Sequence, residues 1–259
     1  MVKLVATDMD GTLLDSSKNL PKDFKEWVLK NSDIKTVIAS GRQYFTLEKD
    51  FIDIKDNLIF IAENGGLVFA KNKIIYKNVI NIEDIAKSLK FIESFTNAHP
   101  IICGAKSAYM HESVEEDVVK NATMYYEKLD YVSDLLEAAQ KDDIVKIAVF
   151  FENKEAEKYY NQFSALPNTL NAVLSGVSWI DIAKKNVNKG VAIKAIQDNF
   201  NITQEESMAF GDYLNDYEML QNCKYSYAMS NAHDKIKEVA NNITKSNDED
   251  GVMCVLRNL

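Results

Sequence analysis

Two aspartates separated by one residue, Asp8 and Asp10, are the residues whose types and spacing could do chemistry in this sequence. They follow an apolar run at residues 2–7 that is short and rich in β-branched and aliphatic side chains, as buried strands are, and Gly11 breaks the pattern just beyond them. Side chains two positions apart on a strand point to the same face. Both carboxylates would then meet at one strand end, where one could attack as a nucleophile while the other carries a proton.

The same pair also fits a simpler interpretation. Two like charges this close are costly unless a cation neutralises them or one carboxyl group stays protonated. An Asp-Gly turn whose carboxylates bond the backbone is the common arrangement of Asp beside Gly. The rest of the chain has to decide between a reactive pair and a turn.

Three further polar clusters stand at comparable places in the chain. They are residues 40–42 (Ser-Gly-Arg), residues 188–190 (Asn-Lys-Gly) and residues 211–216 (Gly-Asp-Tyr-Leu-Asn-Asp). The first and last directly follow the apolar runs at residues 34–39 and 207–210. Because ligands of doubly wound sheets bind beyond the carboxyl ends of the strands, we expect these clusters to surround one ligand.

The residue types in these clusters suit a phosphate monoester and a hard cation. Mg²⁺ prefers oxygen ligands, usually one or two carboxylates with substrate and water, and Asp8 and Asp212 are the best candidates. A hydroxyl beside backbone N–H groups at a helix start can hold phosphate oxygens, which suits Ser40. Lys189 would supply a compact positive charge that offsets the acids, with the lysines at 184–185 as competing candidates.

The elements that must position these clusters alternate between strands and helices in the outer parts of the chain. Apolar runs predict buried strands, and helical spacing predicts helices between them. The strands are at 34–39, 58–62, 207–210 and 225–229. One helix is at 23–30, a second ends at residue 200, and two more begin at residues 215 and 232. This order implies parallel βαβ units, with a hairpin at residues 67–76. We therefore expect an α/β fold, a Rossmann-like doubly wound parallel sheet.

The pattern changes near residue 82. A helix at 82–98 precedes short strands at 101–104 and 108–110, and a helix at 154–166 precedes strands at 170–174 and 178–183. Between these two sets we predict a helix at 114–128 and a strand at 144–151. We place an inserted α+β domain at residues 82–184, within a first domain made of residues 1–81 and 185–259.

Composition limits the partners and the compartment. Apolar residues make up 46% and charged residues 27%, as in ordinary globular proteins, and the net charge of −9 disfavours nucleic acid or an anionic membrane as partner. The three cysteines form no Cys-x-x-Cys pair, which disfavours a zinc site and suits a reducing compartment. No signal-peptide pattern and no apolar stretch of membrane-spanning length is present. We expect a cytoplasmic protein.

In order and spacing, the polar clusters resemble the four motifs of the haloacid dehalogenase superfamily. The matching residues are Asp8-x-Asp10-Gly11-Thr12, Ser40-Gly41-Arg42, Lys189 and Gly211-Asp212-x-x-Asn215-Asp216. The inserted domain resembles the cap of the Cof-type branch, subclass IIB, and the segments at 62–65, 231–232 and 247–252 also resemble that branch. The resemblance covers nearly the whole chain, and the segments at 40–44 and 103–109 are similar to those of the sugar-phosphate phosphatases of that branch.

The resemblance implies a role for each motif residue. Asp8 would be the nucleophile that forms an aspartyl-phosphate, and Asp10 would protonate the leaving oxygen and then deprotonate water. Mg²⁺ would be held by the side chains of Asp8 and Asp212 and by the backbone carbonyl of Asp10. Asp216 would complete or orient the site. The substrate and its phosphoryl group would contact Thr12, Ser40, Gly41, Arg42, Lys189 and Asn215.

Structural roles remain alternatives for several of these residues. Asp212 and Asp216 could be the cap and the first-turn dipole partner of the helix that follows. Ser40 could be a plain N-cap, and Arg42 could pair with surface carboxylates.

We therefore expect a Mg²⁺-dependent phosphatase that hydrolyses small phosphorylated metabolites, with sugar phosphates as the favoured substrates. Hydrolysis of flavin mononucleotide or pyridoxal phosphate is an alternative, and a phosphomutase is the rival reaction. A phospho-receiver or a metabolite-binding protein is the alternative outside the enzymes. The inserted domain and the Asp-x-Asp spacing disfavour the phospho-receiver.

Overall fold

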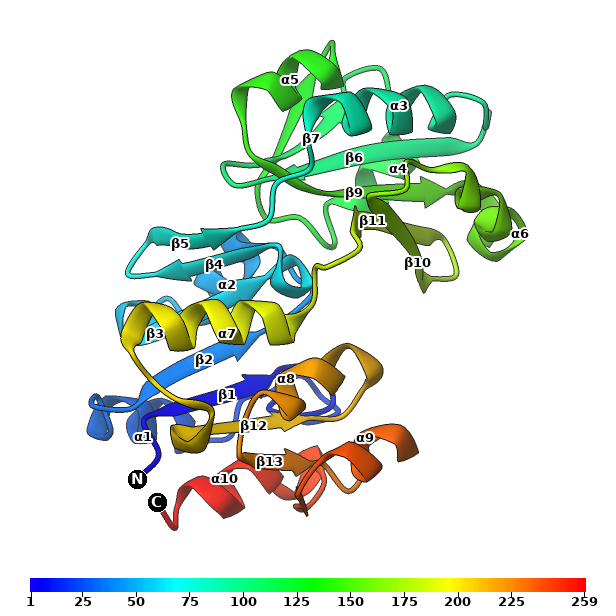
Figure 1. Ribbon diagram of the computed structural model, residues 1–259. Helices are drawn as coiled ribbons and strands as arrows, with labels where there is room; N and C mark the ends of the chain where they lie inside the picture. Colours follow the sequence, from blue (N-terminus) through cyan, green and yellow to red (C-terminus); the bar gives the residue numbers. More distant parts are fainter. The chain divides into compact units, whose positions relative to one another are not determined.

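The computed structural model describes residues 1–259 and divides the chain into two compact units, whose elements are labelled in Figure 1. Met1–Tyr76 and Asn188–Leu259 form the first, called the core unit here, and Lys77–Val187 form the second, called the cap unit. The divisions fall at 76/77 and 187/188, whereas the sequence pattern predicts 81/82 and 184/185.

An eight-stranded sheet forms the centre of the core unit, in the order β14-β13-β12-β1-β2-β3-β4-β5. Its strands are β1 (Leu4–Asp8), β2 (Lys35–Ala39), β3 (Leu58–Ala62), β4 (Leu67–Ala70), β5 (Lys73–Lys77), β12 (Ser207–Gly211), β13 (Tyr225–Ala228) and β14 (Asn242–Ile243). All pairs from β14 to β3 are parallel, and β4 is antiparallel to β3. Every residue of β1, β3 and β12 is buried, and β3 is accordingly apolar throughout.

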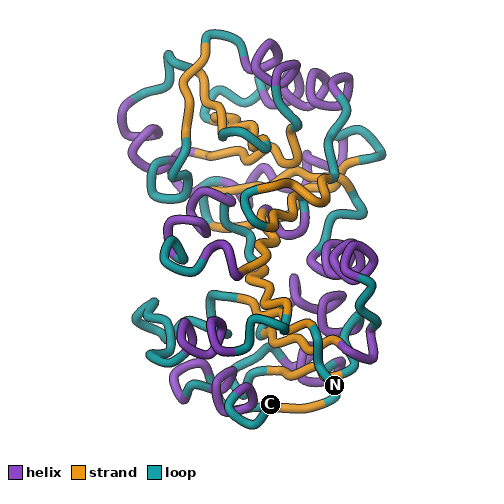
Figure 2. Tube along the Cα trace, turned by 90° about the vertical axis from the view of Figure 1, so that its left-hand side faces the viewer, coloured by secondary structure: helices purple, strands orange, loops and turns teal.

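Helices lie on both sides of this sheet, as the doubly wound prediction requires; Figure 2 shows the strands of the core unit running between them. They are α1 (Phe24–Lys30), α2 (Tyr44–Asp50), α7 (Lys189–Phe200), α8 (Tyr217–Gln221), α9 (Asp234–Val239) and α10 (Gly251–Leu256). The indole N–H of Trp27 in α1 donates to the carbonyl of Leu256 at the end of α10, at 3.0 Å. This bond ties together the two chain segments of the core unit.

The cap unit contains a six-stranded mixed sheet in the order β10-β11-β9-β6-β7-β8, whose pairs are antiparallel except for β7 with β8. Its strands are β6 (Ala98–Gly104), β7 (Ala108–His111), β8 (Leu129–Val132), β9 (Ile144–Phe151), β10 (Leu170–Gly176) and β11 (Trp179–Lys184), and its helices are α3 (Ile82–Ile92), α4 (Glu116–Ala122), α5 (Leu135–Lys141) and α6 (Ala156–Tyr160). Alternate residues of β9 belong to two apolar clusters. Ile147 and Val149 pack with α3 and α5, and Ala148 and Phe150 pack with α4.

The three helices predicted in the cap unit are all longer than the observed α-helices, and the one expected at 154–166 is α6 followed by the 3₁₀ helix η4 (Asn161–Ala165). The helix expected at 82–98 ends at Ile92, and β6 begins at Ala98. Phe91 and Phe95 have helical spacing, but their rings meet edge to face across a turn that follows the helix. The helix expected at 114–128 likewise ends at Ala122, and the short elements β8 and α5 follow where the sequence pattern gave no prediction.

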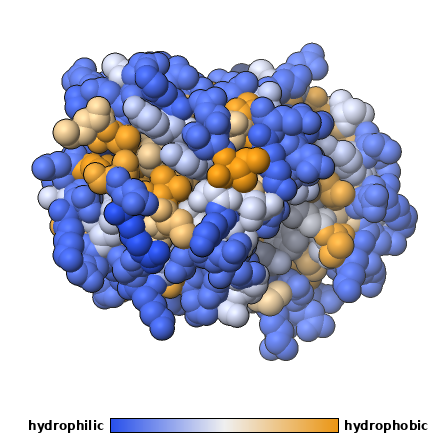
Figure 3. Space-filling view, turned by 90° about the horizontal axis from the view of Figure 1, so that it is seen from below, coloured by the Kyte–Doolittle hydropathy of each residue, from blue (hydrophilic) through white to orange (hydrophobic).

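No helix of the molecule has the length and apolar character needed to cross a membrane. The face of the molecule shown in Figure 3 is mostly hydrophilic, with apolar residues in separate small patches.

Candidate active site

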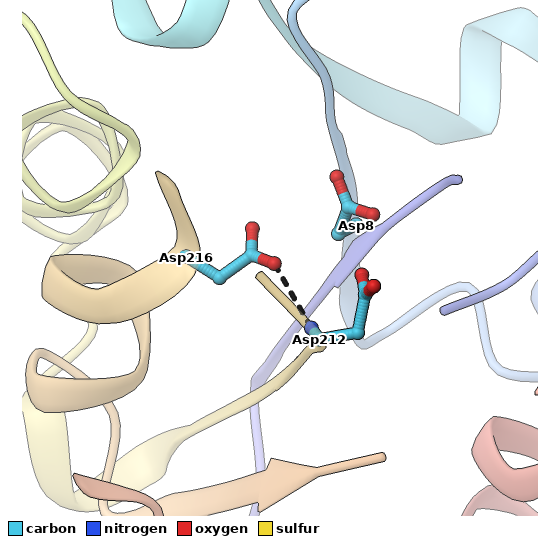
Figure 4. A group of neighbouring side chains, drawn as sticks. All are labelled: Asp8, Asp212 and Asp216. Carbon is cyan, nitrogen blue, oxygen red and sulfur yellow. Dashed lines mark hydrogen bonds between the residues drawn. The ribbon is translucent and has the colours of Figure 1, made fainter. Parts of the chain in front are cut away.

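The carboxyl ends of two neighbouring parallel strands bring Asp8 and Asp212 together. Asp8 is the last residue of β1, and Asp212 directly follows β12, which pairs with β1 through Thr7 and Phe210. Asp216 comes from the turn after Asp212. One carboxylate oxygen from each of these three aspartates lies within 4.8 Å of the others, and Figure 4 shows the three side chains grouped at this edge of the sheet.

Lys189, the first residue of α7, is the cation of this cluster. Its side chain is fully buried, and its Nζ donates to Oδ1 of Asp8 at 2.5 Å and to Oδ1 of Asp216 at 2.7 Å. Asn188 begins α7 by accepting the N–H of Val191, which fixes the helix start from which Lys189 projects. The competing lysines at 184–185 are half-buried and exposed, so Lys189 is the one that the acids surround.

The electrostatics of the cluster leave it short of positive charge. Burial, together with the charges of Asp216 and Asp212, raises the pKa of Asp8 to about 8, although Lys189 opposes this shift. Burial alone would lower the pKa of Lys189, but Asp216 and Asp8 outweigh it and hold that pKa above its usual value. Lys189 is therefore an ammonium group facing three carboxyl groups. A divalent cation would balance the remaining negative charge.

The two oxygens of Asp216 have different partners. While Oδ1 accepts from Lys189, Oδ2 accepts the backbone N–H of Tyr213 at 3.2 Å. Oδ2 also accepts the backbone N–H of Asp212 at 3.0 Å, the bond drawn in Figure 4. These bonds close the 3₁₀ turn η6 (Leu214–Asp216), from which α8 continues. Asp216 therefore stabilises the turn, as the structural alternative expects, and contributes to the acidic cluster as well.

Thr12 and Gly11 shape the surroundings of Asp212. The hydroxyl of Thr12 donates to Oδ1 of Asp212 at 2.8 Å, so Thr12 orients a carboxylate of the cluster. Gly11 has a φ of 84°, and a Cβ at this position would lie 2.5 Å from Oδ2 of Asp212. Only glycine permits both this backbone conformation and this close approach.

Asp10 lies outside the cluster and is held by two cations. Nη2 of Arg42 donates to Oδ1 and Oδ2 of Asp10 at 2.8 and 3.0 Å, and Nζ of Lys18 donates to Oδ1 at 2.8 Å. Burial would raise the pKa of Asp10, but the bonds from Lys18 and Arg42 outweigh it and lower that pKa. Arg42 also donates to Asp50 at 3.0 Å. Arg42 is thus paired with two carboxylates in this structure.

Ser40 is buried at the end of β2, four positions before α2 begins at Tyr44. The alternative that Ser40 is a plain N-cap is therefore wrong. Its Oγ accepts the N–H of Arg42 at 3.2 Å, within the loop that contains Gly41. Asn215, in η6, donates from Nδ2 to Oδ1 of Asn64 at 3.1 Å.

Four polar residues around the site have no role assigned from the sequence: Lys18, Asn64, Asn231 and Asn247. Asn231 donates to the carbonyl of Gly11 at 2.8 Å, and Asn247 donates to the carbonyl of Leu14 at 2.9 Å, which fixes the loop after β1. Asn64, Asn231 and Asn247 lie in segments that show the family resemblance, which is a signal for them. Lys18 lies in no such segment and has no local signal.

Comparison with known proteins agrees with the fold and assigns the chain to a family. The family model described as haloacid dehalogenase-like hydrolase matches residues 5–256, and the chain belongs to this family. The 5-amino-6-(5-phospho-D-ribitylamino)uracil phosphatase YbjI of Escherichia coli K12 is 29% identical over 98% of this chain and 95% of its own.

Solved structures share the whole architecture. SMU.1108c of Streptococcus mutans UA159 is 34% identical, with a TM-score of 0.83 over 100% of this chain and 98% of that one. The subclass IIB sugar phosphatase BT4131 has the same fold, with a TM-score of 0.78 at 24% identity over 99% and 98% of the two chains. The protein is thus a phosphatase of this family, a phosphoric monoester hydrolase, and its mixed-sheet cap unit has the fold seen in these structures.

Proposed function

We propose that the protein is a Mg²⁺-dependent phosphatase of small phosphorylated metabolites, with sugar phosphates as its substrate class and an aspartyl-phosphate on Asp8 as its intermediate. The observation that carries the proposal is the position of Lys189 Nζ, which contacts Asp8 and Asp216 while Asp212 lies beside them. The core unit would carry the chemistry and the cap unit would choose the substrate.

The donor set fits a magnesium ion. Asp8, Asp212 and Asp216 offer three carboxylate oxygens within 4.8 Å of one another, and hard cations such as Mg²⁺ prefer oxygen ligands. These side chains and the backbone carbonyl of Asp10 would hold the ion. When bound, the ion neutralises charge on the phosphoryl oxygens.

The reaction would proceed in two displacements at phosphorus. A carboxylate oxygen of Asp8 attacks, a bond from Asp8 to phosphorus forms, and the bond from phosphorus to the leaving oxygen breaks while Asp10 gives that oxygen a proton. Water then attacks the phosphorus, Asp10 takes the proton of the water, and the bond to Asp8 breaks to release phosphate. Both residues return to their starting states.

The ion pairs of Asp10 suit one half of this cycle. Lys18 and Arg42 keep its carboxylate ionised, as a base requires. To act as an acid, Asp10 needs a proton, so at least one of the two cations has to move from it when substrate binds. We propose that Ser40 and Lys189 meanwhile hold the phosphoryl oxygens, with Gly41 and Asn215 beside them.

A second substrate candidate comes from a relative. The Escherichia coli enzyme named above acts on a phosphorylated ribityl chain attached to a uracil. Flavin mononucleotide carries the same type of chain on its ring system, so a phosphoribityl group joins these two candidates.

The cysteines support a cytoplasmic location. Cys103 and Cys223 are buried and Cys254 is half-buried, and none of them forms a disulfide, which suits a reducing compartment.

The test is phosphate release from a panel of hexose phosphates, the ribitylaminouracil phosphate, flavin mononucleotide and pyridoxal phosphate, with Mg²⁺ and with a chelator. We expect turnover to need Mg²⁺ and to be lost in Asp8→Asn. Turnover that is indifferent to the chelator would contradict the metal assignment, and activity in Asp8→Asn would contradict the intermediate. A transfer of phosphate between sugars without net release would instead indicate a mutase.

A further inference from the structure

The 3₁₀ turn η2 (Glu63–Gly65) joins β3 to β4 and has an unusual backbone. Its three residues all have positive φ, at 51° for Glu63, 52° for Asn64 and 106° for Gly65. Residues other than glycine rarely adopt this region, and such conformations persist where surrounding contacts hold them, often at functional sites. The contacts of Asn64 show what holds this turn.

Asn64 connects two loops that the proposed function places around the phosphoryl group. Its backbone N–H donates to the carbonyl of Ser40 at 3.0 Å, which attaches the turn to the loop after β2. Its side-chain Oδ1 accepts from Nδ2 of Asn215 at 3.1 Å, which attaches the turn to η6. The two loops are thereby joined through a single residue.

The side chain of Asn64 also packs against the backbone of Gly41. A Cβ at Gly41 would lie 2.9 Å from Nδ2 and 3.2 Å from Oδ1 of Asn64. The amide group of Asn64 therefore occupies the space that any other residue at position 41 would fill. The side chain of Asn64 therefore lies directly against Gly41.

Asn215 depends on this contact for its orientation. It is exposed, and an exposed amide side chain otherwise samples several rotamers and both orientations of its amide group. With Nδ2 donating to Asn64, the orientation that turns its oxygen atom toward Asn64 is disfavoured.

We propose that Asn64 is a positioning residue of the phosphatase site, one that orients Asn215 and holds Gly41 in place without itself touching the reacting atoms. This inference rests on the proposed function of Asn215 and Gly41 as substrate contacts. We expect the larger part of its effect on the reaction to pass through Asn215, which makes that part separable from the contact with Gly41 and from a general effect on folding.

The test is the variant Asn64→Gly, because glycine accepts the positive φ and only the amide group is lost. We expect kcat/KM for the best substrate to fall about 10-fold, the scale of one hydrogen bond, chiefly through a higher KM, with an unchanged melting temperature. The matched control is Asn201→Gly, which removes an asparagine side chain at nearly the same φ, 53°, at the exposed end of α7. Its kinetics should equal those of the wild type.

A double variant tests the route through Asn215. In an Asn215→Ala background, Asn64→Gly should cause little further loss, because the group it orients is already absent. If the fold-loss in kcat/KM of the double variant equals the product of the two single losses, the inference is overturned. Wild-type kinetics in Asn64→Gly would overturn it as well. A drop in melting temperature that alone accounts for the lost activity would also overturn it. Failure of the proposed mechanism is seen separately, as turnover that survives in Asp8→Asn.

Discussion

Lys189 and Asp216 form an ion pair in which both side chains are completely buried, with 2.7 Å between Nζ and Oδ1. The pair joins the first residue of α7 to the last residue of η6, at the point where Asp8 ends β1. Removing one partner of such a pair leaves an uncompensated charge in the interior, which costs far more than the loss of an exposed pair. Lys189 should therefore support both the fold and the chemistry.

Replacing Lys189 by Met tests this double role. With the ammonium gone, Asp8 and Asp216 lose their cation, and we expect the free energy of unfolding at neutral pH to fall by about 3–5 kcal/mol without divalent ions. Mg²⁺ should restore part of this loss, because it would replace the missing positive charge. Urea titrations with a chelator and with Mg²⁺ measure both effects.

The control for Lys189→Met is Lys194→Met on the same helix. Lys194 forms an exposed pair with Asp198, so its loss should change the free energy of unfolding by less than about 0.5 kcal/mol. Equal destabilisation by the two changes would contradict the importance of the buried pair.

The variant Asp8→Asn should lose activity and gain stability. We expect kcat to fall about 10⁴-fold or more, because the nucleophile is gone. The pKa of Asp8 is raised from 3.8 to about 8 in the folded protein, so the folded state binds a proton that the unfolded state releases between these values. Wild-type stability therefore declines as pH rises through this window, while the asparagine variant escapes that decline.

Melting temperatures of the two proteins without metal, measured from pH 4 to 8, should diverge as pH rises. Asp53→Asn, at an exposed pair with Lys25, is the control and should follow the wild type in both activity and pH dependence. A constant difference between wild type and Asp8→Asn across the window would argue against the raised pKa.

Arg42→Ala tests the hold on Asp10. Losing the guanidinium removes three hydrogen bonds that Nε and Nη2 donate to Asp10 and that lower its pKa, so the pKa of Asp10 should rise toward its ordinary value. Where hydrolysis of the aspartyl-phosphate limits kcat, Asp10 acts as the base and is inactive when protonated, so the acidic limb of the kcat profile should move to higher pH. The chain's other arginine, Arg257, binds Asp23 through two similar bonds, and Arg257→Ala should leave the limb in place.

Thr12→Val tests the contact with Asp212. Burial raises the pKa of Asp212, and the Thr12 hydroxyl opposes this shift, so its loss makes protons compete better with a cation. We expect the Mg²⁺ concentration for half-maximal activity to rise about 10-fold. In Thr36→Val, the control, a buried hydroxyl without a hydrogen-bond partner is removed from β2, and the Mg²⁺ requirement should stay the same.

The strands and the acidic cluster could be predicted because their signals are local. An unbroken apolar run such as β3 marks a strand buried on both faces, and parallel topology then places the strand ends at one edge. What the pattern missed depends on tertiary contacts. The four-residue strand β8 lies at the sheet edge and has no buried residue, so it lacks an apolar run, and it forms by pairing with β7.

The site shows the same limit. Asp10 and Asp8 are chemically alike in sequence, yet only Asp8 enters the cluster, because Arg42 and Lys18 hold Asp10. The left-handed conformation of Asn64 is likewise imposed by its contacts with the loop at Ser40 and with Asn215. Which of two similar residues enters the site therefore depends on partners that are distant in the sequence.

The division of the core unit into two chain segments has a consequence for biosynthesis. Asp8 and Lys189 are 181 positions apart, and the entire cap unit is translated between them. Until β12 has been translated, β1 lacks its partner on one side and the emerging sheet keeps an open edge. At that stage the contiguous cap unit already has all of its strands. We therefore expect the cap to fold on the ribosome before the core closes, so that the nascent chain remains catalytically silent until its last quarter is made.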